Sequence, residues 1–520
     1  MRDRPLRLVL LGQPVAHSLS PAMQNAAFRV LGIDAEQLTP NELISAILRA
    51  PVDLLYNGGI GTYVKASTES HAEVGDRAND AVRIDGRELR CRVVAEGGNL
   101  GFTQRGRIEA ALNGVRLYTD AIDNSAGVDT SDHEVNIKIL LGLAIAEGEL
   151  TEKQRNALLA QMTEEVAALV LRDNYFQTQS ISYTARIGVK LLDQQARFIR
   201  FLEKSGRLNR ALEFLPSEEE IAERKARGIG LTRPELAVLL AYSKMWLFDE
   251  LLASDVPEDP WIGTALARYF PAALRSRFAA YIPKHPLRRE IIATHVVNSM
   301  INRAGATFVH RLMETTGASA PQIVRAYLLG REVFGFVPLW QSIEALDDRV
   351  PDAVQAEMVL AAGRVGARVV TWFLRSRRLN DPMETVFSRF APAVAALRSG
   401  VPAGEAASAR ARRWIDAGVP EALAREVDGF ERLYAALDIT EVAEATQRKL
   451  QDVAAVYAAV GERLGLARLK QQIEALAADG HWPGLAKTAL AEELADLQRA
   501  IRSEERRVGK ECRSRWSPYH

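Results

Sequence analysis

Cysteine is nearly absent from this sequence, which contains only Cys91 and Cys512 among its 520 residues. Two cysteines cannot form a disulfide framework, and they give no pair with the spacing of metal ligands, so both classes of protein are excluded. The scarcity also fits a reducing compartment, and we therefore expect a cytoplasmic location.

Long apolar runs and an excess of one charge are also lacking. No segment approaches the roughly 18 apolar residues of a membrane-spanning helix. The apolar run at 8–11 is too short for a signal peptide and is followed by Gly12 and Pro14. Because 66 basic residues balance 66 acidic residues, we expect neither a membrane nor a nucleic acid as partner. The hydrophobic content of 48% and charged content of 25% are those of an ordinary globular protein.

Two phosphate-binding motifs are missing as well. The sequence contains neither GxGxxG nor GxxxxGK[ST], so it has no complete fingerprint of a dinucleotide fold or a P-loop. The nearest approach is a turn through Asn57, Gly58 and Gly59, where Val64 occupies the place of the third glycine. This turn follows a predicted strand at 52–56. Ligands bind at the carboxyl ends of parallel strands, so we expect the turn to line a cofactor crevice from the side.

The rest of the chain is organised around residues 93–140. A predicted strand at 91–95 is stopped by four turn-forming residues, Glu96, Gly97, Gly98 and Asn99. A second predicted strand at 115–122 leads into a polar loop that contains Asn124. We expect the two strands to be parallel neighbours, so that their carboxyl-end loops lie side by side. An amphipathic helix is predicted at 67–82, ahead of both strands.

A helix is predicted to begin at Ser131, which forms a capping box with Glu134. Its free N–H groups and positive dipole end would suit an anion such as a carboxylate. Asn99 and Asn124 both donate and accept hydrogen bonds, which suits an amide or ribose hydroxyls. The plain alternative is equally open at this point: asparagine and glycine build turns, and Ser131 only caps a helix.

These motifs resemble those of a known enzyme family. AEGGN and DAIDNSAGVDTSDHE are similar to the AEGAN and NAGGV-x-x-S elements of glutamate dehydrogenases. The longer run from DLLYNGGIGTYVKAS to NIKILL resembles the large NAD-specific bacterial subfamily without gaps. The resemblance implies that Asn99 and Asn124 contact the nicotinamide riboside half of NAD, and that Ser131 holds the side-chain carboxylate of glutamate. In that family a catalytic lysine, an aspartate and a Gly-rich phosphate turn precede the matched segment. We therefore expect no NADH production from glutamate by this chain alone.

Residues 7–38 resemble a different family. The run GQPVAHSLSPAMQNAAF is similar to the opening of shikimate dehydrogenases, with Gln24 where that family has histidine. The resemblance implies that Ser18 and Ser20 bind a shikimate carboxylate. A helix capped by Ser20 with Pro21 at its first position explains the same residues.

From residue 148 onward the pattern is helical. Capping boxes at Thr151, Ser217 and Thr232 each precede an apolar-periodic run, and no strand-like alternation interrupts residues 148–502. Segments such as LRDNYFQTQS resemble the C-terminal helical region of the same large dehydrogenases. Residues 503–520 lack helical periodicity and resemble neither family.

The predicted fold is thus α/β, with a partial Rossmann-type dinucleotide-binding domain followed by a large all-α domain. The expected divisions are 1–38, 39–147, 148–502 and an unrelated tail at 503–520. Three functions remain open: an NAD-dependent glutamate dehydrogenase, here incomplete or chimeric, that converts L-glutamate to 2-oxoglutarate and ammonium; a non-catalytic helical fragment; and a shikimate dehydrogenase-like protein. The expected cofactor is NAD, no metal is expected, and the resemblance implies a homo-oligomer in the full-length family.

Overall fold

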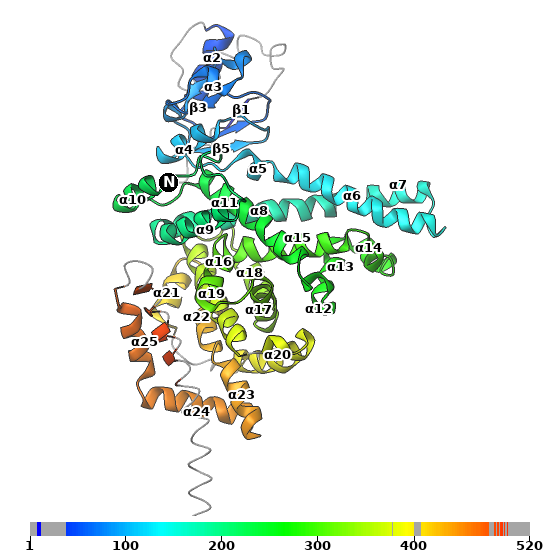
Figure 1. Ribbon diagram of the computed structural model, residues 1–520, viewed down its shortest axis with the longest axis vertical. Helices are drawn as coiled ribbons and strands as arrows, with labels where there is room; N and C mark the ends of the chain where they lie inside the picture. Colours follow the sequence, from blue (N-terminus) through cyan, green and yellow to red (C-terminus); the bar gives the residue numbers. More distant parts are fainter. Residues whose placement is uncertain are drawn as a thin grey trace, which may run out of the picture. The chain divides into compact units, whose positions relative to one another are not determined.

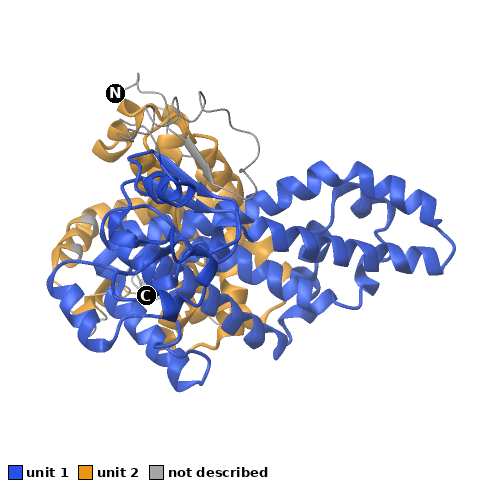
Figure 2. Cartoon of the chain, turned by 90° about the horizontal axis from the view of Figure 1, so that it is seen from above, with its two compact units in different colours: residues 1–308 blue, residues 309–520 orange. Residues whose placement is uncertain are grey.

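A computed structural model describes residues 8–11, 38–376, 378–399 and 407–477, together with isolated residues between 483 and 497. Ser18, Ser20 and the predicted tail at 503–520 lie outside these described residues. The chain divides into two compact units, residues 1–308 and 309–520, which Figure 2 shows in different colours. The division falls within the predicted helical region, and each unit is described by itself.

The first unit begins with short strands and helices and continues with long helices (Figure 1). Its elements up to the start of the long helices are β1 (Leu8–Leu11), α2 (Pro40–Leu48), β2 (Leu54–Asn57), β3 (Val64–Lys65), α3 (His71–Val74), η1 (Arg77–Asn79), β4 (Ile84–Asp85), η2 (Gly86–Glu88), β5 (Val93–Glu96), α4 (Gln104–Leu112) and α5 (Asp120–Asp123). The helices that follow are α6 (Ser125–Ala146), α7 (Glu152–Gln161), α8 (Thr163–Ile187), η3 (Gly188–Leu191), α9 (Leu192–Lys204), α10 (Glu218–Ala226), α11 (Arg233–Leu252), η4 (Val256–Glu258), α12 (Pro260–Gly263), α13 (Ala265–Tyr269), α14 (Ala272–Arg277), η5 (Ile282–Lys284) and α15 (Arg288–Ala304).

The main sheet is parallel and has the strand order β1-β2-β5. The register pairs Leu55 with both Val9 and Val94, which places β2 in the centre. Buried apolar side chains around the sheet form one core, including Leu48 from α2, Phe102 from the loop before α4, and Ala110 from α4. The predicted strands at 52–56 and 91–95 are confirmed, each displaced by one or two residues toward the carboxyl end.

The predicted strand at 115–122 is wrong beyond its first residues. Val115 and Leu117 are buried, but pairing is limited to one bridge between Arg116 and Val93. Asp120 then begins the short helix α5, and its side chain accepts a hydrogen bond from the Leu100 backbone N–H at 2.8 Å. This long-range polar contact outweighs the strand propensity of the local sequence.

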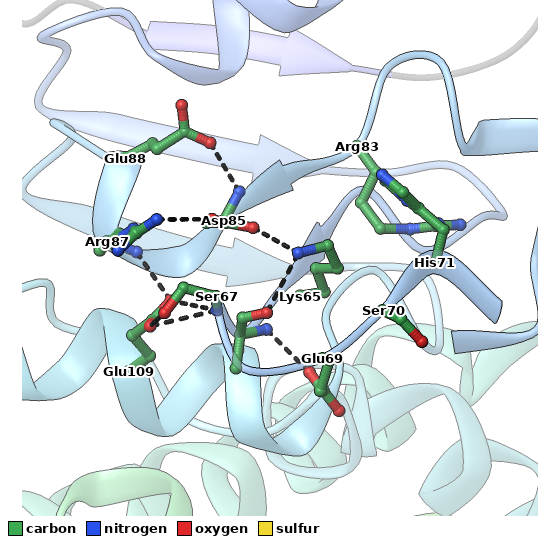
Figure 3. A network of polar contacts seen from close by, with 12 residues as sticks. Lys65, Ser67, Glu69, Ser70, His71, Arg83, Asp85, Arg87, Glu88 and Glu109 are labelled. Carbon is green, nitrogen blue, oxygen red and sulfur yellow. Dashed lines mark hydrogen bonds and ion pairs between the residues drawn. The ribbon is translucent and has the colours of Figure 1, made fainter. Parts of the chain in front are cut away.

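The predicted helix at 67–82 is also wrong, because this segment is a compact excursion between β2 and β5. Helix α3 has only four residues and ends at Gly75, whose φ of 75° is left-handed. Strands β3 and β4 form a second, two-stranded parallel sheet. Figure 3 shows the polar network around this sheet, in which Lys65 pairs with Asp85 at 2.5 Å and Ser67 binds Glu109. Polar side chains thus fix residues 67–82, among which Val82 is the one buried side chain.

The long helices pack through large apolar side chains, and their starts follow the sequence. The capping boxes at Thr151, Ser217 and Thr232 are confirmed at the first residues of α7, α10 and α11. Trp246 of α11 lies edge-on to Phe198 of α9, with ring centroids 5.7 Å apart. In the described ranges, no strand follows β5.

The second unit is helical throughout its described residues. Its elements are α16 (Phe308–Thr316), which begins at the boundary, α17 (Ala320–Val333), α18 (Phe336–Glu344), α19 (Asp352–Arg375), η6 (Arg378–Asn380), α20 (Met383–Ser399), α21 (Ala409–Asp416), α22 (Glu421–Leu433), α23 (Ala436–Thr446), α24 (Leu450–Arg463) and α25 (Leu466–Ala475). Aromatic side chains form its core, with Phe336 5.0 Å from Phe430 and Trp372 5.4 Å from Phe390 between ring centroids. Among the described residues of the whole chain, no helix combines the length and the apolar character that crossing a membrane requires.

Candidate functional site at the carboxyl ends of β2 and β5

The turns after β2 and β5 are bonded to each other. The Asn57 carbonyl accepts hydrogen bonds from the N–H groups of Gly97 and Gly98, at 2.9 and 3.2 Å. The Asn57 side chain accepts a bond from the Gly59 N–H at 3.4 Å, which shapes the turn through Gly58. A Cβ atom at Gly97 would stand 2.0 Å from the Tyr56 hydroxyl oxygen, so any other residue there would displace the Tyr56 side chain. The two predicted glycine turns therefore form one continuous surface.

The structure brings Asn99 and Asn124 together, as the sequence predicts. The Asn124 Nδ2 donates to the Asn99 Oδ1 at 2.6 Å, across the loops that follow β5 and α5. Asn99 is exposed and Asn124 is half-buried. The mutual bond uses one donor of Asn124 and one acceptor of Asn99, and it leaves the other amide atoms of both side chains for a ligand.

A buried ionic network lies beneath the asparagine pair, and the sequence analysis missed it. Arg107 of α4 donates to both carboxylate oxygens of Glu96, at 2.7 and 2.8 Å, and contacts Asp120 at 3.3 Å. Arg107 is 4% exposed and Glu96 is 1% exposed. An acid and an arginine on either side of a glycine turn can indicate an ion pair, but their spacing in the sequence does not show that the two side chains meet.

Asp123 completes the network from the other loop. One of its carboxylate oxygens accepts a hydrogen bond from the Glu96 backbone N–H at 2.9 Å. Burial raises the pKa of Asp123 to about 7, and the negative charges of Glu96 and Asp120 add to this shift, while the Glu96 N–H and Arg107 oppose it. The carboxyl next to Asn124 therefore changes charge near neutral pH.

The loop between Asn99 and α4 presents one large apolar side chain, that of Leu100, to solvent. Leu100 has a φ of 61°, and its side chain is 66% exposed. Its N–H binds Asp120 and its carbonyl accepts a bond from the Thr62 hydroxyl, each at 2.8 Å. A left-handed non-glycine residue costs about 1 kcal/mol or more, and such residues cluster at functional sites. Ile60, on the adjoining turn, is 90% exposed.

The predicted helix start at Ser131 is wrong. Helix α6 begins at Ser125, so Ser131 lies on an exposed part of the helix, about 9 Å along its axis from the start. Glu134 does not bond back to Ser131 but pairs with Lys138 on the next turn. The first turn of α6 consequently begins at Asn124, whose carbonyl accepts a bond from the Gly127 N–H at 3.0 Å, and Ser131 remains a surface hydroxyl on the same helix.

The residues around Asn57 fit a polar ligand such as NAD. Asn57 is buried, and its Nδ2 has no hydrogen-bond partner among the described residues. A buried amide donor normally has a partner, so this atom and the remaining amide atoms of Asn99 and Asn124 offer bonds that a ribose or carboxamide would satisfy. The region thus supplies a set of neutral donors and acceptors on a rigid base.

Comparison with known proteins accounts for most of the chain. Residues 16–184 match the model of the bacterial NAD-glutamate dehydrogenase catalytic domain, and residues 228–507 match that of the glutamate dehydrogenase C-terminal region. The chain belongs to the family of bacterial NAD-specific glutamate dehydrogenases. The site residues from Asn57 to Ser131 all lie within the catalytic-domain match.

Individual relatives agree with this membership. The chain is 48% identical to the NAD-specific glutamate dehydrogenase of Halomonas elongata over 490 residues, which are 93% of this chain and 30% of that protein. It is 48% identical to the Pseudomonas aeruginosa enzyme over 475 residues, and 41% identical to the Mycobacterium tuberculosis enzyme over 486 residues. The chain thus spans less than a third of the length of these relatives. A 59-residue stretch, 11% of the chain, is 49% identical to the shikimate dehydrogenase (NADP(+)) of Methanosarcina mazei.

Proposed function

We propose that the surface around Asn57, Asn99 and Asn124 is the nicotinamide-riboside side of an NAD site in a glutamate dehydrogenase. Residues 39–147, which contain β2 and β5, are then the C-terminal half of a Rossmann-type dinucleotide-binding domain. The observation that carries the proposal is the 2.6 Å bond between Asn99 and Asn124, because it joins two loops at the sheet edge where such ligands bind.

Each residue has a distinct task in this proposal. Asn99 and Asn124 bind the carboxamide or ribose hydroxyls through the amide atoms that their mutual bond leaves available, and Asn57 adds a donor. NAD, when bound, accepts the hydride in the oxidative deamination of L-glutamate to 2-oxoglutarate and ammonium. The buried bidentate pair of Arg107 with Glu96 ties together the two ends of the loop that carries Asn99, and the contact of Arg107 with Asp120 links that loop to the one that carries Asn124.

The substrate end of the proposal concerns Ser131. Its exposed hydroxyl on α6 can donate one hydrogen bond to the side-chain carboxylate of glutamate. The roles of Gly58, Gly59, Gly97 and Gly98 are to let the two turns approach a ligand closely. The assignment of Ser18 and Ser20 to a carboxylate, a homo-oligomeric assembly and a cytoplasmic location stay predictions.

Binding of NADH to the chain tests the cofactor site. Asn99→Ala and Asn124→Ala should each raise the Kd for NADH about tenfold, since each removes a hydrogen bond worth about 1–1.5 kcal/mol. Affinity for ADP, which lacks the nicotinamide riboside half, should stay within twofold of the wild type. Asn156→Ala, an exposed asparagine on α7, serves as the matched control. Equal affinities of the wild type and both site variants for NADH would contradict the proposal.

A further inference from the structure

Helix α8 holds the loop that carries Asn124. The Asn174 Nδ2 donates to the Ile122 carbonyl at 2.7 Å and to the Ser125 hydroxyl at 3.0 Å. The Gln177 Nε2 donates to the same hydroxyl at 3.3 Å. These bonds reach Ser125, directly after Asn124, and Ile122, two residues before it. Both amides belong to LRDNYFQTQS, a segment that contributes no residue to the proposed cofactor site itself.

A second row of contacts supports this attachment. The Lys244 ammonium of α11 donates to the Gln177 Oε1 at 3.2 Å, which orients the amide so that its nitrogen faces Ser125. Tyr118, at the start of the same loop, shares a 2.7 Å hydrogen bond with the Ser182 hydroxyl of α8. The loop 118–125 is therefore bonded to α8 near both of its ends, and Figure 1 shows α5 and α6 beside α8.

We infer that Asn174 and Gln177 are positioning residues for Asn124, through which the long helices fix the geometry of the cofactor site. The inference rests on the proposed function, because it concerns the same asparagine pair. A bond between side chains of two separate loops, such as that of Asn99 with Asn124, needs an external support if it is to persist. The amides on α8 supply that support, since α8 packs against α6, α11 and α15.

Donor and acceptor chemistry distinguishes positioning from general packing. The Ile122 carbonyl only accepts, so Asn174→Asp would set a carboxylate against a carbonyl oxygen and lose the 2.7 Å bond. The Ser125 hydroxyl, in contrast, can turn and donate to Glu in Gln177→Glu. Lys244 would then pair with the new carboxylate. Two equally conservative amide-to-acid changes, three residues apart on one helix, should therefore have opposite outcomes.

The charges near these amides bear on the choice of variants. Asp173 and Asp129 face Lys244, and burial lowers the pKa of Lys244 to about 8 while these two acids oppose the shift. An added carboxylate at 174 would also meet this negative pair. Asn174→Leu removes the bonds without adding charge and serves as the neutral version of the test.

The experiment measures hydrogen exchange in peptides covering 118–127 together with the Kd for NADH. Asn174→Asp and Asn174→Leu should each speed exchange in this segment about tenfold and raise the Kd about tenfold. Gln177→Glu should leave both within twofold of the wild type. Gln179→Ala is the matched control, since Gln179 lies on α8 but bonds to Arg303 and Tyr175 rather than to the loop.

The outcomes separate the two proposals. Unchanged exchange in 118–127 for both Asn174 variants, or equal loosening by Gln177→Glu, would overturn the positioning role. Faster exchange with an unchanged Kd would overturn it too, because the bonds from α8 would then hold the loop without affecting NADH binding. Failure of Asn99→Ala and Asn124→Ala to weaken NADH binding contradicts the proposed function instead, and the exchange results still decide whether α8 clamps the loop.

Discussion

Replacing Arg107 by methionine tests the buried network beneath the asparagine pair. Methionine keeps most of the side-chain volume but removes both hydrogen bonds to Glu96 and the contact with Asp120. Removing one partner of a buried ion pair typically costs about 3–5 kcal/mol, because the remaining charge is left uncompensated. This loss of folding stability has an upper limit, since Glu96 can become neutral by taking up a proton.

The upper limit on the destabilisation is the free energy of protonating the Glu96 carboxyl, which depends on pH. Protonating a carboxyl of ordinary pKa near 4.3 at pH 7 costs about 3.7 kcal/mol, at about 1.36 kcal/mol per pH unit. In Arg107→Met the pKa of Glu96 in the folded protein lies above its value in the unfolded chain. The destabilisation is therefore fully present at high pH and is relieved as the pH falls. We expect a loss of about 3–4 kcal/mol at pH 7 and about 1 kcal/mol at pH 5.

The assay is urea-dependent hydrogen exchange of peptides covering 93–112, which reports the first unit without a contribution from the second. The double variant Glu96→Gln/Arg107→Met is the control, because it removes the buried charge. It should be more stable than Arg107→Met at pH 7 by about 2 kcal/mol and should show little pH dependence. Equal losses at pH 5 and pH 7 for Arg107→Met, or a double variant no more stable than the single one, would refute the reasoning.

Three further changes test other parts of the first unit. Burial raises the pKa of Asp123 to about 7, so between about pH 4 and 7 the folded state keeps a proton that the unfolded chain releases. As the pH rises through this range, the free energy of unfolding of the wild type should therefore fall relative to that of Asp123→Asn. Parallel pH profiles of the two proteins would contradict this. Gly97→Ala should cost about 1–3 kcal/mol through its contact with Tyr56, and Tyr56→Ala should relieve it in thermal unfolding. Lys65→Met should lower the stability of the excursion by about 1–3 kcal/mol, seen as faster exchange in 62–90, because Asp85 loses its shortest partner; unchanged exchange there would show that the pair is dispensable.

The strands and helix starts that local sequence predicts correctly have local causes. Residues 54–57 and 93–96 are short, largely apolar runs that end in glycine turns, so each signal lies within the segment itself. The capping boxes at Thr151, Ser217 and Thr232 are also local, since both partners lie within one turn. Asn99 meets Asn124 although most of the strand predicted before Asn124 is a helix, because a bridge between Arg116 and Val93 and the bond of the Glu96 N–H to Asp123 hold this segment beside β5.

The failures have distant causes. Residues 120–123 turn into a helix while Asp120 and Asp123 bond to the backbone of Leu100 and Glu96, more than 19 residues away. The segment 67–82 is held by Glu109, 42 residues beyond Ser67. Periodicity within a window of about 11–18 residues contains no information on such partners.

The sequence contains a capping-box motif at Ser131 and Glu134, but the helix does not begin there. A capping box stabilises a helix start only where the preceding residues are not already helical, and here Asn174, 49 residues from Ser125, supports an earlier start. The first turn of α6 consequently begins at Asn124, which bonds to Asn99, and not at Ser131. An effect of Ser131→Ala on glutamate affinity would therefore report a direct contact of the hydroxyl, because the substitution leaves the start of α6 unchanged.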